Sequence, residues 1–337
     1  MYFFVLALPG RFGEWCDTLT ARLAERMLGP TETMSANTLE EMARNVMRSG
    51  ASQAVISSRQ PGGLMGAALL ATGRNFVVAI DDPRLALADL VLGRGTPLAA
   101  AVQQVASSCA AIANYLAAPG AMKLTHVGEG HQSRMIAGMI ARHLGMTLDE
   151  AAIGETVEEV AATGLAPDRS AGLGWWDRLQ GDDRRLAEGA IAPLVSYLTT
   201  GNLPPLLWER GLFFIGETGA ERAAGTIDIT GRARCLLHGP YVTLPPGAWS
   251  LALRLRLSRE TADHEFRVEV VADSQLASGT LRSEGEGQVE VHLAFEIDGS
   301  DDHPLSIRLS TQRAAFDGAV TLLGATLVRA ASDTVGL

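Results

Sequence analysis

The segment 123–134 contains the side chains best suited to proton transfer. His126, Glu129 and His131 follow a short apolar run and lie between a lysine and an arginine. Sites in α/β proteins are built where strands end. A histidine beside a carboxylate can form an acid–base pair, so these three residues are the candidate catalytic groups. A polar surface loop would have the same composition, and the sequence leaves both interpretations open.

A second candidate lies where the first apolar run ends, in Pro9-Gly10-Arg11-Phe12-Gly13-Glu14-Trp15. Backbone N–H groups at the start of a helix bind anions, and glycine allows the anion to approach. Arg11 and Gly13 are therefore candidate cofactor-binding residues. A tight strand-to-helix turn also requires glycine, so a purely structural role is the favoured interpretation.

Alternating strand and helix patterns must position these groups. Apolar strand-type runs at 2–8, 53–57, 76–80 and 123–127 alternate with helical patterns at 17–28, 39–48, 63–70, 83–92, 97–117, 132–144 and 183–197. This alternation predicts an α/β domain with a parallel sheet over residues 1–205.

A different pattern begins after the turn-rich segment 199–205. Apolar residues recur at every second position in 249–257, 266–270, 288–295 and 306–309, with turn signals between them. Several short alternating strands without helices predict an all-β sandwich over residues 206–337.

Composition limits the classes of function. The chain has 337 residues, of which 47% are hydrophobic and 20% charged, so folded domains are expected. Its formal net charge of −10 argues against nucleic-acid binding, which needs a basic surface. Cys16, Cys109 and Cys235 lie far apart without metal-ligand spacing, so we expect no metal and a reducing compartment.

The two apolar segments, at the start of the chain and at 96–118, are not expected to be a signal peptide or a transmembrane helix. The first residues lack a preceding basic region, and the stretch 96–118 contains glutamine, serine and asparagine. We therefore predict no membrane span and a cytoplasmic location. The apolar helices 97–117 and 132–144 could offer a face for a homo-oligomer.

Four segments, in order, resemble the cytosolic-type sulfotransferase family. They are Pro9–Trp15, then Ser57-Ser58-Arg59-Gln60-Pro61, then Asp81-Asp82-Pro83-Arg84-Leu85-Ala86-Leu87-Ala88-Asp89, and Arg169-Ser170-Ala171-Gly172-Leu173-Gly174-Trp175-Trp176. The resemblance covers about residues 1–200. It implies a phosphate-loop fold that binds 3′-phosphoadenosine 5′-phosphosulfate, with Arg84 and Arg169 as further candidates for the cofactor site.

The departures from the family all oppose that chemistry. Phe12, Glu14 and Trp15 replace small and hydroxylated residues of the phosphate loop. Asp81 and Asp89 stand where the family holds the 3′-phosphate, and they would repel it. Arg59 replaces the proton-accepting histidine and cannot act as a base. The resemblance therefore implies a degenerate site without a bound cofactor.

The second domain resembles a sandwich module of bacterial glycan-processing and surface-polysaccharide proteins. The resemblance rests on Ile229-Thr230-Gly231-Arg232-Ala233-Arg234, Gly239-Pro240-Tyr241 and Leu244-Pro245-Pro246-Gly247-Ala248-Trp249. Tyr241 and Trp249, flanked by Arg232 and Arg234, are candidate carbohydrate-binding residues. The same two aromatic side chains could instead fill the sandwich core.

Three functions remain open at this point. The leading hypothesis is a non-catalytic, sulfotransferase-like binding or assembly protein of bacterial surface-polysaccharide metabolism, with a glycan or a polysaccharide-synthesis protein as partner. The alternatives are an active sulfotransferase or related group transferase acting on a glycan, and a structural partner protein. A loop at 9–15 closed by Phe12 or Trp15 would favour a non-catalytic role, and an open loop with convergent basic groups would favour the transferase.

Overall fold

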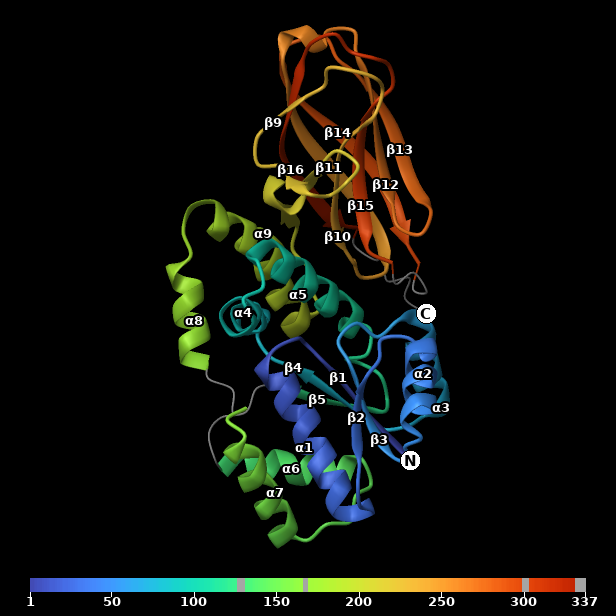
Figure 1. The fold of residues 1–337 in the computed structure, drawn as a ribbon, viewed down its shortest axis with the longest axis vertical. Helices are drawn as coiled ribbons and strands as arrows, with labels where there is room; N and C mark the ends of the chain where they lie inside the picture. Colours follow the sequence, from blue (N-terminus) through green and yellow to red (C-terminus); the bar gives the residue numbers. More distant parts are fainter. Residues whose placement is uncertain (126–130, 166–168, 299–302, 331–337) are drawn as a thin grey trace. The chain divides into compact units, whose positions relative to one another are not determined.

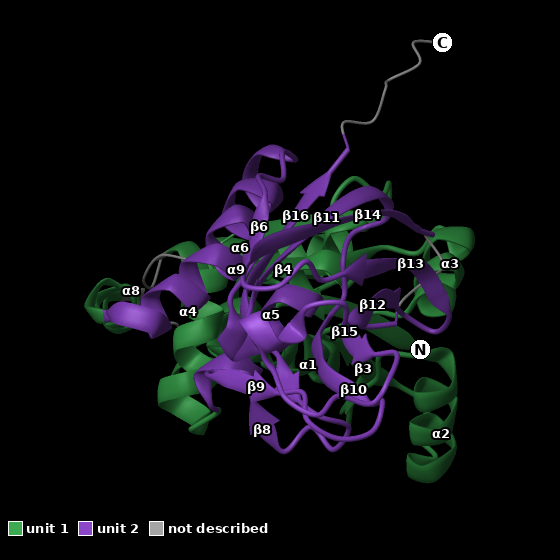
Figure 2. Ribbon diagram, turned by 90° about the horizontal axis from the view of Figure 1, so that it is seen from above, with its two compact units in different colours: residues 1–96, 108–178 green, residues 97–107, 179–337 purple. Residues whose placement is uncertain are grey.

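The chain forms two compact units in the computed structural model, which describes residues 1–125, 131–165, 169–298 and 303–330. The first unit comprises Met1–Thr96 and Ser108–Arg178, and the second comprises Pro97–Ser107 and Leu179–Leu337 (Figure 2). The first unit contains a parallel sheet with helices and the second contains antiparallel sheets, so the predicted fold class is confirmed.

The first unit is built on a five-stranded parallel sheet with the strand order β2-β3-β1-β4-β5 (Figure 1). Its strands are β1 (Tyr2–Ala7), β2 (Glu32–Ser35), β3 (Ala54–Ser58), β4 (Phe76–Ile80) and β5 (Ala121–Thr125). From β1 the chain continues to β2 on one side of the sheet, and from the neighbouring β4 it continues to β5 on the other side. This reversal makes the carboxyl ends of β1, β3 and β4 the expected place for a site.

Helices cover this sheet because their apolar faces match its buried side chains. They are α1 (Arg11–Leu28), α2 (Leu39–Ser49), α3 (Gly63–Thr72), α4 (Pro83–Ala88), α6 (His131–His143), α7 (Glu150–Ala162) and α8 (Arg169–Arg178), with a π-helical turn η1 at Asp89–Gly93. One face of β1, with Phe3, Val5 and Ala7, shares a core with α1, α6 and α7. Three of the described helices begin with a side-chain cap, which is Thr38 for α2, Asp82 for α4 and Asp149 for α7.

The second unit contains two antiparallel sheets. The six-stranded sheet has the order β13-β12-β15-β10-β7-β8, and the other has the order β14-β11-β16-β6, with β9 pairing to β16. The strands are β6 (Leu206–Trp208), β7 (Phe214–Ile215), β8 (Glu221–Arg222), β9 (Thr226–Asp228), β10 (Cys235–Val242), β11 (Gly247–Leu257), β12 (Glu265–Val271), β13 (Gln275–Arg282), β14 (Gly287–Ile297), β15 (Leu305–Thr311) and β16 (Ala319–Arg329), with 3₁₀ turns η2 (Arg210–Leu212) and η3 (Arg259–Thr261).

The second unit also contains helical residues besides its two sheets. Helix α5 (Leu98–Ala113) contributes its first part to this unit, and α9 (Gly181–Thr200) belongs to it entirely. Helix α9 packs tightly on β6, because a Cβ at Gly189 would lie 2.6 Å from the Leu207 carbonyl oxygen. Among the described residues, no helix is long and apolar enough to cross a bilayer.

The domain boundary predicted near residue 205 can be tested by cutting the chain. A fragment that starts at Leu179 keeps α9 on β6, whereas one that starts at Asn202 loses it. We expect the longer fragment to melt cooperatively, and the shorter one to melt at least about 10 °C lower. Circular dichroism of the two fragments measures this. Equal melting temperatures would show that α9 is dispensable, and no cooperative melt in either would mean that the two units share one core.

Candidate functional site

The loop between β1 and α1 is held tightly against α4. Gly10 has φ of +121°, a conformation that only glycine adopts without strain. A Cβ at Gly10 would lie 2.9 Å from Oδ2 of Asp89 and 3.3 Å from Cα of Ala86. The loop expected to hold a phosphate is therefore closed by neighbouring atoms of the same chain.

The carboxylate of Asp89 occupies the first turn of α1. The backbone N–H of Arg11 donates a hydrogen bond to Asp89 Oδ2 over 2.8 Å. Helix N-termini attract anions, and here the anion is a side chain of the protein itself. Burial raises the pKa of Asp89, while the Arg11 N–H opposes that shift. The resemblance placed Asp89 at the 3′-phosphate, but its carboxylate lies at the loop expected to hold the 5′ group.

Phe12 and Trp15 do not close this loop. Both side chains are 4% exposed, stack with ring centroids 6.1 Å apart and lie in the core between α1 and the sheet. Gly13 packs there too, because a Cβ would lie 2.5 Å from the Leu8 carbonyl oxygen. The loop is closed, as the non-catalytic hypothesis expects, but the closing group is Asp89.

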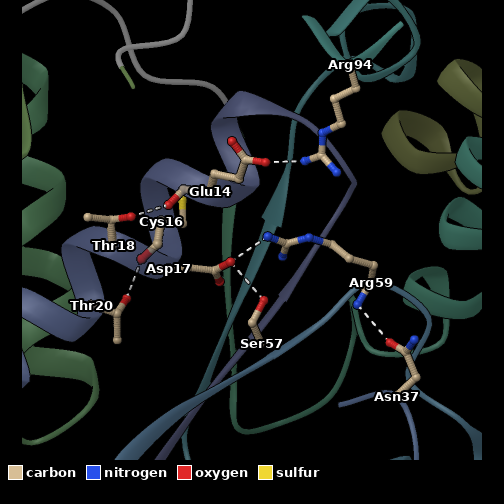
Figure 3. Close-up of polar contacts among 9 residues, drawn as sticks. All are labelled: Glu14, Cys16, Asp17, Thr18, Thr20, Asn37, Ser57, Arg59 and Arg94. Carbon is tan, nitrogen blue, oxygen red and sulfur yellow. Dashed lines mark hydrogen bonds and ion pairs between the residues drawn. The ribbon is translucent and has the colours of Figure 1, made fainter. Parts of the chain in front are cut away.

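A buried polar network lies beside the first two turns of α1 (Figure 3). Asp17 accepts a hydrogen bond from the Ser57 hydroxyl over 2.8 Å and forms an ion pair with Arg59 Nη2 at 2.5 Å. Burial raises the pKa of Asp17, and the charge of Arg59 and the hydroxyl of Ser57 oppose that shift. Asp17 Oδ1 and Arg59 Nη1 are buried without a hydrogen-bond partner among the described residues.

Asn37 fixes the backbone that carries Arg59. Its side-chain oxygen accepts hydrogen bonds from the Ser58 hydroxyl, the Arg59 N–H and the Gln60 N–H, at 2.9, 3.1 and 3.0 Å. The Arg59 guanidinium then lies over the first turn of α1, 3.2 Å from the position of a Cβ at Gly13. A permanent cation fills the place of the family's base, so this network cannot accept a proton from a substrate through residue 59.

Sequence reasoning singled out Arg59 but missed Asp17 and Asn37. Asp17 adjoins the apolar stripe of α1, which runs through Phe12, Cys16 and Leu19. A charged residue next to such a stripe could have indicated a buried carboxylate with a polar partner. Asn37 follows the edge strand β2, which lacks a clear strand pattern, so no comparable pattern pointed to this residue.

The other loop residues are partnered locally. Arg84 pairs with Asp82, with Nε 3.0 Å from each carboxylate oxygen, and its guanidinium lies 6.0 Å from the Trp176 ring centroid. Glu14 forms an ion pair with Arg94 on the outer side of α1 (Figure 3). The exposed side chain of Arg11 reaches the Gly164 carbonyl over 3.5 Å. The Arg84 guanidinium therefore pairs with Asp82, the residue that caps α4, and is not free to bind a phosphate.

The candidate catalytic segment is largely outside the described residues. His126 and Glu129 lie there, as do the side chains of His131 and of the cofactor candidate Arg169. A cavity of about 950 Å³ between α6 and α7 is lined by residues that include Gln132 and Arg134. The acid–base pair proposed from the sequence therefore stays a prediction.

The candidate carbohydrate-binding residues separate into two groups. Trp249 is 2% exposed, and its indole N–H donates to the Pro245 carbonyl over 3.0 Å, so it is a core residue and cannot stack on a sugar. Arg234 donates to the carbonyls of Thr230 and Asp228 and holds their turn. Tyr241 is 41% exposed, and Arg232 is also exposed. Only these last two remain available for a ligand.

Comparisons with known proteins agree with this architecture. No family model and no curated protein matches the chain. A mouse sulfotransferase complexed with PAP is similar at 9% identity over 59% of this chain and 83% of its own, with a TM-score of 0.42. A xylan-binding module matches 38% of this chain and 97% of its own, at 12% identity and a TM-score of 0.27. A family 16 carbohydrate-binding module matches 34% of this chain and 81% of its own, at 12% identity and a TM-score of 0.24.

The chain thus consists of an α/β part and a β-sandwich part, and the solved structures that resemble it include a sulfotransferase and carbohydrate-binding modules. Both resemblances inferred from the sequence therefore have a counterpart among the solved structures, at 9–12% identity. Identities this low carry no conclusion about activity.

Proposed function

We propose that this chain is a non-catalytic, sulfotransferase-like protein that serves as a binding or assembly component of bacterial surface-polysaccharide metabolism. The observation that carries the proposal is the Asp89 carboxylate on the first turn of α1. A phosphate placed about 4 Å from it would be repelled by roughly 1 kcal/mol in water and about 4 kcal/mol near a protein surface.

The remaining groups support the same proposal. Transfer of a sulfuryl group needs a base near the acceptor hydroxyl, and Arg59 supplies a fixed cation instead. The guanidinium of Arg84 is taken by Asp82. The glycan part of the proposal rests on the sandwich and on the exposed ring of Tyr241. The cytoplasmic location and the homo-oligomer stay predictions.

We expect the full chain not to bind adenosine 3′,5′-bisphosphate, with a Kd weaker than about 1 mM in isothermal calorimetry. The physical reason is the internal carboxylate that already holds the Arg11 N–H. Asp89→Gly vacates this position, and weak binding is expected to return in that variant. Micromolar binding by the unaltered chain would overturn the closed-site proposal.

An active group transferase is the second candidate, and one observation favours it. Asp17 Oδ1 and Arg59 Nη1 are buried at the carboxyl edge of the sheet without partners among the described residues, and a polar ligand could satisfy both. Transfer of radiolabelled sulfate from 3′-phosphoadenosine 5′-phosphosulfate to a polysaccharide tests this candidate. Transfer by the unaltered chain would establish it, and no transfer would exclude this reaction.

A further inference from the structure

Strand pairing assembles a row of six residues on the outer face of the six-stranded sheet. Directly opposed residues of antiparallel strands lie on the same face. The row is Ser278, Glu269, Arg308, His238, Phe214 and Arg222. The adjacent row contains Val268, Leu309 and Leu237, all 0% exposed, so it faces the core. The row around His238 must therefore face away from the core.

Tyr241 is held over this row as a fixed, exposed ring. Its hydroxyl lies 2.7 Å from Nδ1 of His238. Its ring centroid is 5.5 Å from that of His238 and 6.1 Å from that of Phe214. Phe214 also stacks on His238 and carries the Arg222 guanidinium 4.0 Å from its own ring centroid. The ring of Tyr241 nevertheless remains 41% exposed.

Two features of this cluster are costly for the fold by itself. Tyr241 has φ of +62°, a left-handed conformation that a bulky residue rarely adopts. His238 is 7% exposed, and its Nε2 has no hydrogen-bond partner among the described residues. Strain and an unsatisfied polar atom beside an exposed aromatic ring point to a site that is kept for a ligand.

The charges on this face favour an anion. Arg308 is exposed directly across from His238, and its guanidinium makes no hydrogen bond or ion pair with another described residue. The neighbouring Glu269 is paired with Arg267 at 3.0 Å. Burial, and then the charge of Arg308, lower the pKa of His238, so the imidazole is neutral at pH 7. An exposed guanidinium thus lies across from His238, the residue that the Tyr241 ring contacts, and the carboxylate of Glu269 on the next strand is in an ion pair.

We propose that this face binds an anionic polysaccharide, with the apolar face of a uronic acid ring on Tyr241 and its carboxylate on Arg308. The inference rests on the proposed glycan role and adds the class of ligand and the site. A rigid aromatic side chain stacks on the C–H groups of a sugar at little entropic cost. A guanidinium binds a carboxylate through paired, charge-assisted hydrogen bonds.

The test measures binding of the full chain to polygalacturonate and to neutral galactan by affinity electrophoresis. We expect retardation by polygalacturonate only. Arg308→Gln should weaken it at least about tenfold, because one bidentate charged contact is lost. Arg256→Gln removes the same charge from an exposed position on the other sheet and should change the affinity less than about twofold.

Tyr241→Gly separates binding from folding. This variant removes the ring and relieves the positive φ, so we expect binding to be lost while the melting temperature is maintained or raised. A clear fall in melting temperature would show that the ring is structural and would overturn the site. Equal retardation by galactan would refute the anionic class but leave the glycan role standing. Retardation by neither polymer would refute both.

Discussion

Trp249→Ala is expected to destabilise the sandwich by about 3–5 kcal/mol. The indole is 2% exposed within the core and its N–H donates to the Pro245 carbonyl, so the substitution leaves both a cavity and an unpaired carbonyl. Urea denaturation of the full chain measures the loss in the sandwich transition.

Phe316 provides the matched control for this experiment. Its side chain is 98% exposed in the same unit, and Phe316→Ala should change the stability by less than about 0.5 kcal/mol. A loss below about 1 kcal/mol for Trp249→Ala would contradict the core assignment and return this residue to the candidate sugar platforms.

Arg59→Met is expected to lower the free energy of unfolding of the first unit by about 3–5 kcal/mol, because it leaves Asp17 buried without its cation. Replacing both partners, as Asp17→Asn with Arg59→Met, should recover a large part of that loss. Chemical denaturation of the two variants and the unaltered chain measures the coupling. If the double variant is no more stable than Arg59→Met, the ion pair is not the origin of the effect.

The pH dependence of Arg59→Met supplies an independent check. Burial already raises the pKa of Asp17 above its ordinary value of 3.8, and loss of Arg59 removes an opposing effect. The folded variant then binds a proton more tightly than its unfolded chain, so its stability falls as the pH rises through the interval between the two pKa values. The deficit relative to the unaltered chain should be largest at neutral pH and above, shrink as the pH falls toward about 4, and stay constant below that. A deficit independent of pH would contradict this account.

The strands with strong apolar runs could be predicted from the sequence. Tyr2–Ala7, Ala54–Ser58 and Phe76–Ile80 are buried on both faces and read as continuous apolar segments, as expected of a parallel sheet. The edge strand Glu32–Ser35 was missed because only Met34 is buried. Helix Glu150–Ala162 was also missed, since its glycine and acidic residues weaken the apolar pattern.

The candidate site was predictable in its elements but not in its contacts. The loop at residues 9–15 followed from residue types and order, and Asp89 was singled out by the resemblance to sulfotransferases, which placed it at the 3′-phosphate. The hydrogen bond between Asp89 and Arg11 joins positions 78 residues apart, and no local pattern encodes it. The cluster of Phe214, His238 and Arg308 likewise depends on strand register, which sequence alone did not supply.

The internal anion at α1 also has a consequence for protein abundance. Many nucleotide-binding folds gain stability from their ligand, and their folded fraction follows its concentration. Here the anion is the Asp89 carboxylate, which is part of the chain. It is therefore always available to accept the Arg11 N–H and to balance the partial positive charge at the start of α1. The folded population of this unit should therefore be independent of the concentration of nucleotides in the cell.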